Sequence, residues 1–137
     1  MFKVISGFCE EVNGTSRVGE IEVVYKDLVA AFGEPGESDG HKVSGEWCFV
    51  NSETGEAYTL YDWKSTCLYD DMLPSVERFR ANPRPQWFNI GGNGRGDVKE
   101  FKRMMLAHIK WIKMHKPFED AILGSSDQQL MFVQVKK

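Results

Sequence analysis

The chain has 137 residues, of which 42% are hydrophobic and 12% aromatic, and this is enough apolar material for one domain with a buried core. Its 17 Lys and Arg against 20 Asp and Glu leave a formal net charge of −3, which argues against sequence-specific DNA binding. No run approaches the roughly 18 apolar residues of a membrane span, and the first residues lack the pattern of a secretory signal. We therefore expect a cytoplasmic protein without membrane contact.

The first part of the sequence predicts a strand, a turn and a short helix. Residues 2–8, FKVISGF, alternate as a strand does, and residues 13–20, NGTSRVGE, read as a turn because Asn-Gly favours positive φ. Residues 23–33, VVYKDLVAAFG, end at Gly33, the usual residue after a helix C-terminus. One face of this helix carries the apolar residues Val24, Leu28, Ala31 and Phe32.

The middle of the sequence predicts a hairpin and then an irregular segment. Residues 34–42 are polar and read as a loop, and residues 43–64 read as two strands joined by a turn at 53–55. Residues 65–85 hold three of the five prolines between short apolar islands. We interpret them as an insertion with one helical turn near 75–80.

The last part predicts a strand at 86–90, a long helix capped by Asp97 and ended by Pro117, and a closing strand within 130–137. The helix has one face whose residues recur at the spacing of a buried face: Val98, Phe101, Met105, His108, Ile109 and Ile112. The opposite face is basic and carries Lys99, Lys102, Arg103, Lys110, Lys113 and Lys116. The whole pattern predicts a single α+β domain over 1–137: a mostly antiparallel sheet of four to five strands, a short N-terminal helix and a long C-terminal helix.

The segment WFNIGGNGRGDVKEF, residues 87–101, suggests an anion site because glycines lead into a helix N-terminus. The expected ligand-binding residues are Gly91, Gly92, Asn93, Gly94, Arg95 and Lys99, with Trp87 or Trp63 as a stacking wall for a base. The pattern matches neither the P-loop nor the G-x-G-x-x-G motif. Asp97 would also compete with an anion for the helix N–H groups, so the segment reads more readily as a tight structural corner than as an anion site.

Charge and aromatic residues are unevenly distributed. Residues 1–77 carry 5 Lys or Arg against 15 Asp or Glu (−10), whereas residues 78–137 carry 12 against 5 (+7). An acidic half and a basic half can each attract a partner of opposite charge, or the two halves can pack against each other within the chain. Aromatic side chains gather in the hairpin and at 87–88; alternation puts Trp47 and Phe49 on one sheet face and Tyr61 and Trp63 on another.

Catalytic and metal motifs are lacking. The three histidines are far apart in sequence, and Cys9, Cys48 and Cys67 show no C-x-x-C spacing, so we expect thiols rather than disulfides or a zinc site. No cofactor is expected. One enzymatic alternative stays open: Asp62, Asp70 and Asp71 beside Glu46 could hold a divalent ion for phosphoester hydrolysis.

Four stretches together resemble a family of small uncharacterised proteins encoded by tailed bacteriophages. They are GTSRVGE (14–20), YKDLVAAFGEPGESDGHKVSGEW (25–47), YTLYDWK (58–64) and WFNIGG (87–92), together 43 of the 137 residues. The chain departs from the short family form by a longer segment between Lys64 and Trp87 and by a longer C-terminus. The resemblance implies a phage accessory protein in the host cytoplasm, without an activity that transfers residue by residue.

Two functions of different class follow from these observations. The first is a non-enzymatic counter-defence or host-takeover protein that binds a phosphate-bearing nucleotide signal at the glycine turn. The second is an inhibitor that docks on a host or defence protein through a charged face. The sequence leaves open whether the chain forms a homo-oligomer.

Overall fold

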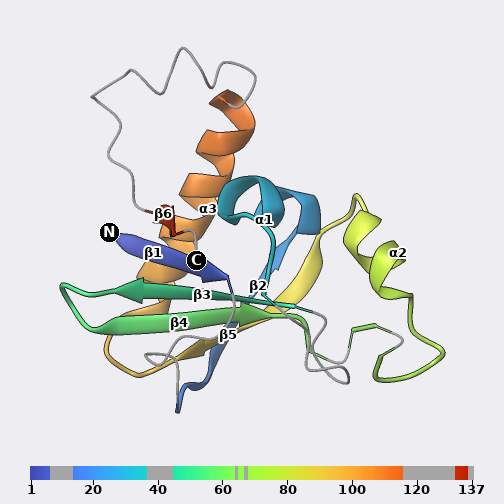
Figure 1. Cartoon of the computed structure of the whole chain (residues 1–137), viewed down its shortest axis with the longest axis horizontal. Helices are drawn as coiled ribbons and strands as arrows, with labels where there is room; N and C mark the ends of the chain where they lie inside the picture. Colours follow the sequence, from blue (N-terminus) through green and yellow to red (C-terminus); the bar gives the residue numbers. More distant parts are fainter. Residues whose placement is uncertain (7–13, 37–44, 64, 67, 116–131, 136–137) are drawn as a thin grey trace.

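Six strands and three helices make up the described part of the chain, which in this computed structural model comprises residues 1–6, 14–36, 45–63, 65–66, 68–115 and 132–135 (Figure 1). In chain order they are β1 (Phe2–Ser6), β2 (Ser16–Val23), α1 (Tyr25–Phe32), β3 (Glu46–Asn51), β4 (Glu56–Tyr61), α2 (Val76–Ala81), β5 (Gln86–Gly92), α3 (Val98–His115) and β6 (Phe132–Val135). Lys116, Pro117, Cys9, Cys67 and parts of the predicted segments 2–8, 34–42 and 130–137 lie outside these residues.

All six strands belong to one sheet, in the order β2-β5-β4-β3-β1-β6. Neighbouring strands are antiparallel, except that β6 pairs in parallel with β1. The predicted hairpin is confirmed as β3 and β4, and Gly55 has a φ of 78° in the turn between them. The α+β class and the mostly antiparallel sheet are therefore confirmed, with one strand more than the predicted four to five.

The additional strand is β2, and the predicted turn over 13–20 was wrong from Ser16 onward. Strand β2 pairs along its length with β5, with a register shift between Arg17 and Gly19. The turn prediction gave weight to the Asn-Gly pair at its start. Strand propensity depends on cross-strand neighbours, and those lie about 70 residues away in the sequence.

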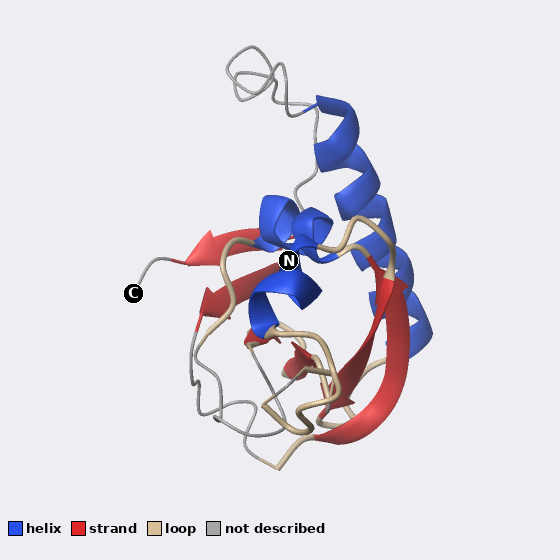
Figure 2. Cartoon of the chain, turned by 90° about the vertical axis from the view of Figure 1, so that its right-hand side faces the viewer, coloured by secondary structure: helices blue, strands red, loops and turns tan. Residues whose placement is uncertain are grey.

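Helices α1 and α3 pack against each other on one face of the curved sheet (Figures 1 and 2). The predicted inner face of the long helix is confirmed: Phe101, Met105, His108 and Ile109 are buried, and Val98 and Ile112 pack against the same core. The predicted face of α1 is confirmed at Leu28, Ala31 and Phe32, while Tyr25 takes the buried place expected for Val24.

The ends of the helices also follow from the sequence. Gly33 follows α1 with a φ of 84°, and its N–H donates to the carbonyl of Val29. Ser75 caps α2, because its hydroxyl accepts the N–H of Arg78 at 3.1 Å. The Asp97 carboxylate accepts the N–H of Lys99 at 2.9 Å and so caps α3 as predicted.

The two faces of the sheet differ in what they bury. Trp47 and Phe49 lie on the helix-covered face and are at most 1% exposed, with Tyr58 and Leu60 opposite them on β4. On the other face Tyr61 is half-buried, and Trp63, just past β4, is 44% exposed. None of the helices within the described ranges combines the length and hydropathy that a bilayer crossing requires.

Candidate functional site

The first two glycines of the predicted turn are strand residues. Gly91 and Gly92 are buried at the end of β5, where Gly91 pairs with Thr59 and Gly92 with Tyr58. A Cβ at position 91 would collide with the Thr59 hydroxyl, and one at position 92 would lie 3.0 Å from the Val18 side chain. Close strand packing therefore requires these glycines whether or not a ligand binds.

The loop that follows is tied to the neighbouring hairpin. The Asn93 amide donates to the carbonyl of Gly55 at 2.8 Å, and its backbone N–H donates to Ala57 at 3.2 Å. The Asn93 side-chain oxygen also accepts the N–H of Arg95 at 3.2 Å. The exposed Arg95 side chain lies against Gly55, since a Cβ there would be 2.8 Å from a guanidinium nitrogen. These contacts build a corner between two turns.

Acidic groups surround the start of α3. Besides the Asp97 cap, the Glu56 carboxylate lies against Gly96, and a Cβ at Gly96 would be 2.5 Å from the Tyr58 hydroxyl. Burial, together with the carboxylates of Glu56 and Asp97, raises the pKa of Tyr58 to about 12. A phosphate at this helix end would meet two carboxylates, and one of them already accepts a helix N–H.

The predicted stacking wall lies away from the turn. Trp87 precedes Gly92 by five residues on β5, which is about 17 Å at the usual strand rise. Trp63 comes two residues after the end of β4, and its ring lies 6.2 Å from that of Tyr61. Because Tyr61 pairs with Asn89, both tryptophans belong to the end of β4 and β5 opposite the turn. The predicted site therefore divides into two places.

The three aspartates of the enzymatic alternative do not come together. Asp62 is 1% exposed and accepts the N–H of Gly45 at 3.2 Å, whereas Asp70 and Asp71 are exposed on the loop before α2. Within the described ranges, no three His, Cys, Asp or Glu side chains converge as a metal site would need. We therefore find no support for the phosphoesterase hypothesis in this part of the chain.

A polar cluster around the buried Tyr25, at the start of α1, was not predicted from the sequence. The Arg80 guanidinium carbon lies 5.4 Å from the centre of the Tyr25 ring. Burial raises the pKa of Tyr25 to about 12, an effect that Arg80 opposes and that Glu34 and Asp62 support. A sequence signal could not have found this cluster, because its members come from α1, α2 and two loops. We interpret it as an anchor for α2.

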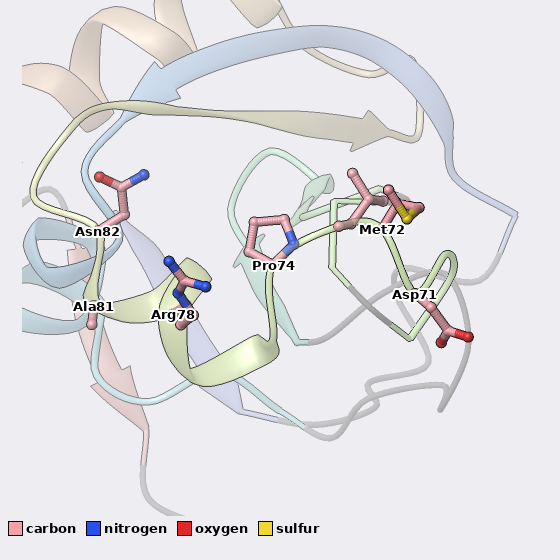
Figure 3. A pocket seen from close by; sticks show the side chains of 7 residues that line it. Asp71, Met72, Pro74, Arg78, Ala81 and Asn82 are labelled. Atoms are coloured by element: carbon pink, nitrogen blue, oxygen red, sulfur yellow. The ribbon is translucent and has the colours of Figure 1, made fainter.

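A hollow lies between the loop after β4 and α2 (Figure 3). Its lining consists of Asp71, Met72, Leu73, Pro74, Arg78, Ala81 and Asn82. Met72 is 90% exposed, and Arg78 and Asp71 point in different directions in Figure 3. The hollow contains none of the predicted ligand-binding residues, and we assign it no chemistry.

The outer face of α3 carries a basic stripe. It comprises the exposed Lys99, Arg103, Leu106, Lys110, Lys113 and Met114, with the half-buried Lys102 at its flank. The helix has five Lys or Arg against one Glu. Arg103 pairs with Glu100 on the same helix, and Lys113 pairs with Asp27 of α1 at 3.2 Å. Among the described residues, Lys99, Lys102 and Lys110 have no carboxylate within 4 Å.

A comparison with protein-family models and one with curated proteins both returned no match. The resemblance to phage proteins stays a prediction.

Proposed function

We propose that the chain is a non-enzymatic binding protein whose basic stripe docks on an acidic surface of another protein. The observation that supports this proposal is the separation of faces on α3, where buried apolar residues hold the helix on the sheet and the basic stripe points outward. In the setting that the resemblance implies, this is a phage accessory protein acting on a host or defence protein in the host cytoplasm.

A protein partner fits the stripe better than a nucleic acid does. Leu106, between Arg103 and Lys110, is 47% exposed, and Met114, next to Lys113, is 61% exposed. A protein surface can cover such apolar side chains, whereas a phosphate backbone offers them little. The stripe lysines that have no carboxylate partner among the described residues would attract an acidic partner. They would thereby raise its association rate and orient it on the stripe.

Capture of a partner from bacterial lysate tests this proposal. A double variant with Lys102→Glu and Lys110→Glu should recover at least about tenfold less of any partner that the unchanged chain captures at low salt. The control, Lys3→Glu with Arg84→Glu, makes the same charge change at exposed positions off the stripe and should capture normally. Equal recovery by the two double variants would exclude the stripe as the docking surface.

A second candidate function is binding of a phosphate-bearing nucleotide at the glycine turn. The observations in its favour are that Arg95 and Lys99 are both exposed and that a Cβ at Gly94 would meet open space. Native mass spectrometry of the chain mixed with a bacterial nucleotide extract tests it. A bound mass that Arg95→Ala abolishes and that Trp87→Ala preserves would support a site at the turn alone; an apo spectrum would end this candidate.

A further inference from the structure

The sheet has an exposed patch on the face that α1 and α3 leave uncovered. The strand pairing places side chains there in two neighbouring rows that run across the strands. The first row consists of Tyr61 of β4, Asn89 of β5 and Glu20 of β2. The second row contains Trp87 of β5 and its partner Glu22 of β2. Side chains in such rows are about 5 Å apart, and strands about 4.8 Å apart. We define the sheet patch as Arg17, Glu20, Glu22, Tyr61, Trp63, Trp87 and Asn89.

The sheet patch is exposed, although the centre of its face is not. Trp87 is 55% exposed and Trp63 44% exposed, whereas Cys48 and Ala57 on the same face are fully buried. Arg17 is held within the patch, since it pairs with Glu20 at 3.1 Å and donates to Asn89 at 3.2 Å. Glu22 has no Lys or Arg within 4 Å among the described residues.

This combination of side chains suits a cationic and partly apolar surface. Tryptophan faces attract Lys and Arg, and carboxylates beside them fix the sign of the charge. The same carboxylates, Glu20 and Glu22, would repel phosphates, so the aromatic residues are poorly placed to stack on a nucleic acid. The partner should therefore present lysines or arginines interleaved with aliphatic side chains.

The basic stripe of the same chain has this composition. Its Lys102 and Lys110 complement the carboxylates of the patch, and its Leu106 and Met114 complement the two tryptophans. The two surfaces cannot meet within one chain, because Phe101 and Met105 hold α3 against the core and the stripe points outward. The patch also points away from the core.

We propose that the basic stripe of one copy docks on the sheet patch of a second copy. The contact is electrostatic with an apolar centre, so it should be weak and should weaken further with salt. It occupies the surface that the proposed function assigns to another protein. Self-association would then compete with partner binding. At high protein concentration most stripes would be covered by the sheet patch of another copy.

Sedimentation velocity of the purified chain tests this inference directly. At about 50 mM salt the average mass should rise between about 10 and 500 µM protein, and at about 500 mM salt the rise should be lost. Variant P, Glu20→Lys with Glu22→Lys, and variant S, Lys102→Glu with Lys110→Glu, should each associate at least about tenfold more weakly. The control, Glu53→Lys with Glu77→Lys, changes charge at exposed positions elsewhere and should associate like the unchanged chain.

Mixing the two variants gives the sharpest result. Variant P retains the stripe and variant S retains the patch, and their reversed charges also attract each other, so an equimolar mixture should regain the association that each has lost. A monomer at every concentration, or a mixture that stays monomeric, would overturn the inference. If circular dichroism shows variant P to be unfolded, Trp87→Ser replaces it as the patch variant.

The failure of this inference is distinguishable from failure of the proposed function. Self-association is measured on the purified chain alone. Partner capture is measured with variant P, whose stripe is intact and uncovered. A chain that does not self-associate can still capture a partner through its stripe, and a chain that captures no partner can still self-associate.

Discussion

At the residue scale, the glycine-rich loop is explained by its neighbours in the fold. Gly91 and Gly92 allow β4 and β5 to pack closely, and Gly96 makes room for the Glu56 and Tyr58 side chains. Each glycine could be identified as special from the sequence, because four occur within six residues. The atoms that approach the Cα of each glycine come from paired strands distant in the sequence. They therefore could not be predicted from the residues around the glycine.

Gly96→Ala should lower the free energy of unfolding by about 1–3 kcal/mol, as overpacking does. The new Cβ would collide with the flexible Glu56 carboxylate and lie 2.5 Å from the Tyr58 hydroxyl. That ring cannot move easily, because it stacks on Phe101 with 4.0 Å between ring centres. Denaturant unfolding measures the loss. In a background with Glu56→Ala and Tyr58→Phe the same substitution should cost less; an equal cost would show that another contact is responsible.

At the element scale, elements with several local signals were predicted, and the strand with only one weak local signal was missed. The cap at Asp97 and the end at Gly33 were predicted because each depends on groups within four residues. Strand β2 offered one local signal, the alternation of Glu20, Ile21, Glu22 and Val23. Because this strand was read as a turn, the acidic half of the sheet patch was missed with it.

The contact between α1 and α3 should make stability depend on pH through His108. This side chain is 7% exposed, and its Nε2 lies 3.3 Å from the carbonyl of Ala31, which fits a neutral ring whose N–H donates. Burial lowers the pKa of His108 below its usual 6.5, an effect that the hydrogen bond to Ala31 partly offsets. Protonation therefore favours the unfolded chain, and stability present above pH 6.5 is lost as the pH falls below it.

Comparing the free energy of unfolding at about pH 7.5 and about pH 5.5 measures this dependence, which for one histidine is at most about 1.4 kcal/mol per pH unit. His108→Leu should reduce the difference between the two pH values. His115→Leu, near the end of the same helix, removes a second histidine and serves as the control. A difference that persists undiminished in His108→Leu would assign the pH dependence to other groups.

At the scale of the whole molecule, β6 joins the end of the described chain to its beginning. Phe132 is 4% exposed, and its ring centre lies 5.7 Å from that of Phe2, 5.1 Å from that of Phe32 and 5.7 Å from that of Phe49. One side chain of β6 thus contacts β1, α1 and β3. The parallel pairing with β1 places this strand at the edge of the sheet.

Phe132→Ala should therefore lower the free energy of unfolding by about 3–5 kcal/mol, as large-to-small substitutions in a core do. Val133→Ala, at a half-buried position of the same strand, should cost about 1 kcal/mol or less. Urea unfolding of both variants gives the comparison. If both substitutions lowered the free energy of unfolding by a similarly small amount, the Phe132 side chain would not be part of the stabilising core.

The sequence by itself determined the α+β class, the hairpin, the positions and inner faces of α1 and α3, and the charge difference between the two halves. These features depend on periodicity and on caps, which neighbouring residues encode. Only the tertiary structure decided that Ser16–Val23 pairs with β5, that Gly91 and Gly92 are strand residues, and that Trp63 and Trp87 lie at the far end of the sheet from Arg95. Strand pairing joins residues distant in sequence, and the side chains that share a surface are known only when the register is known.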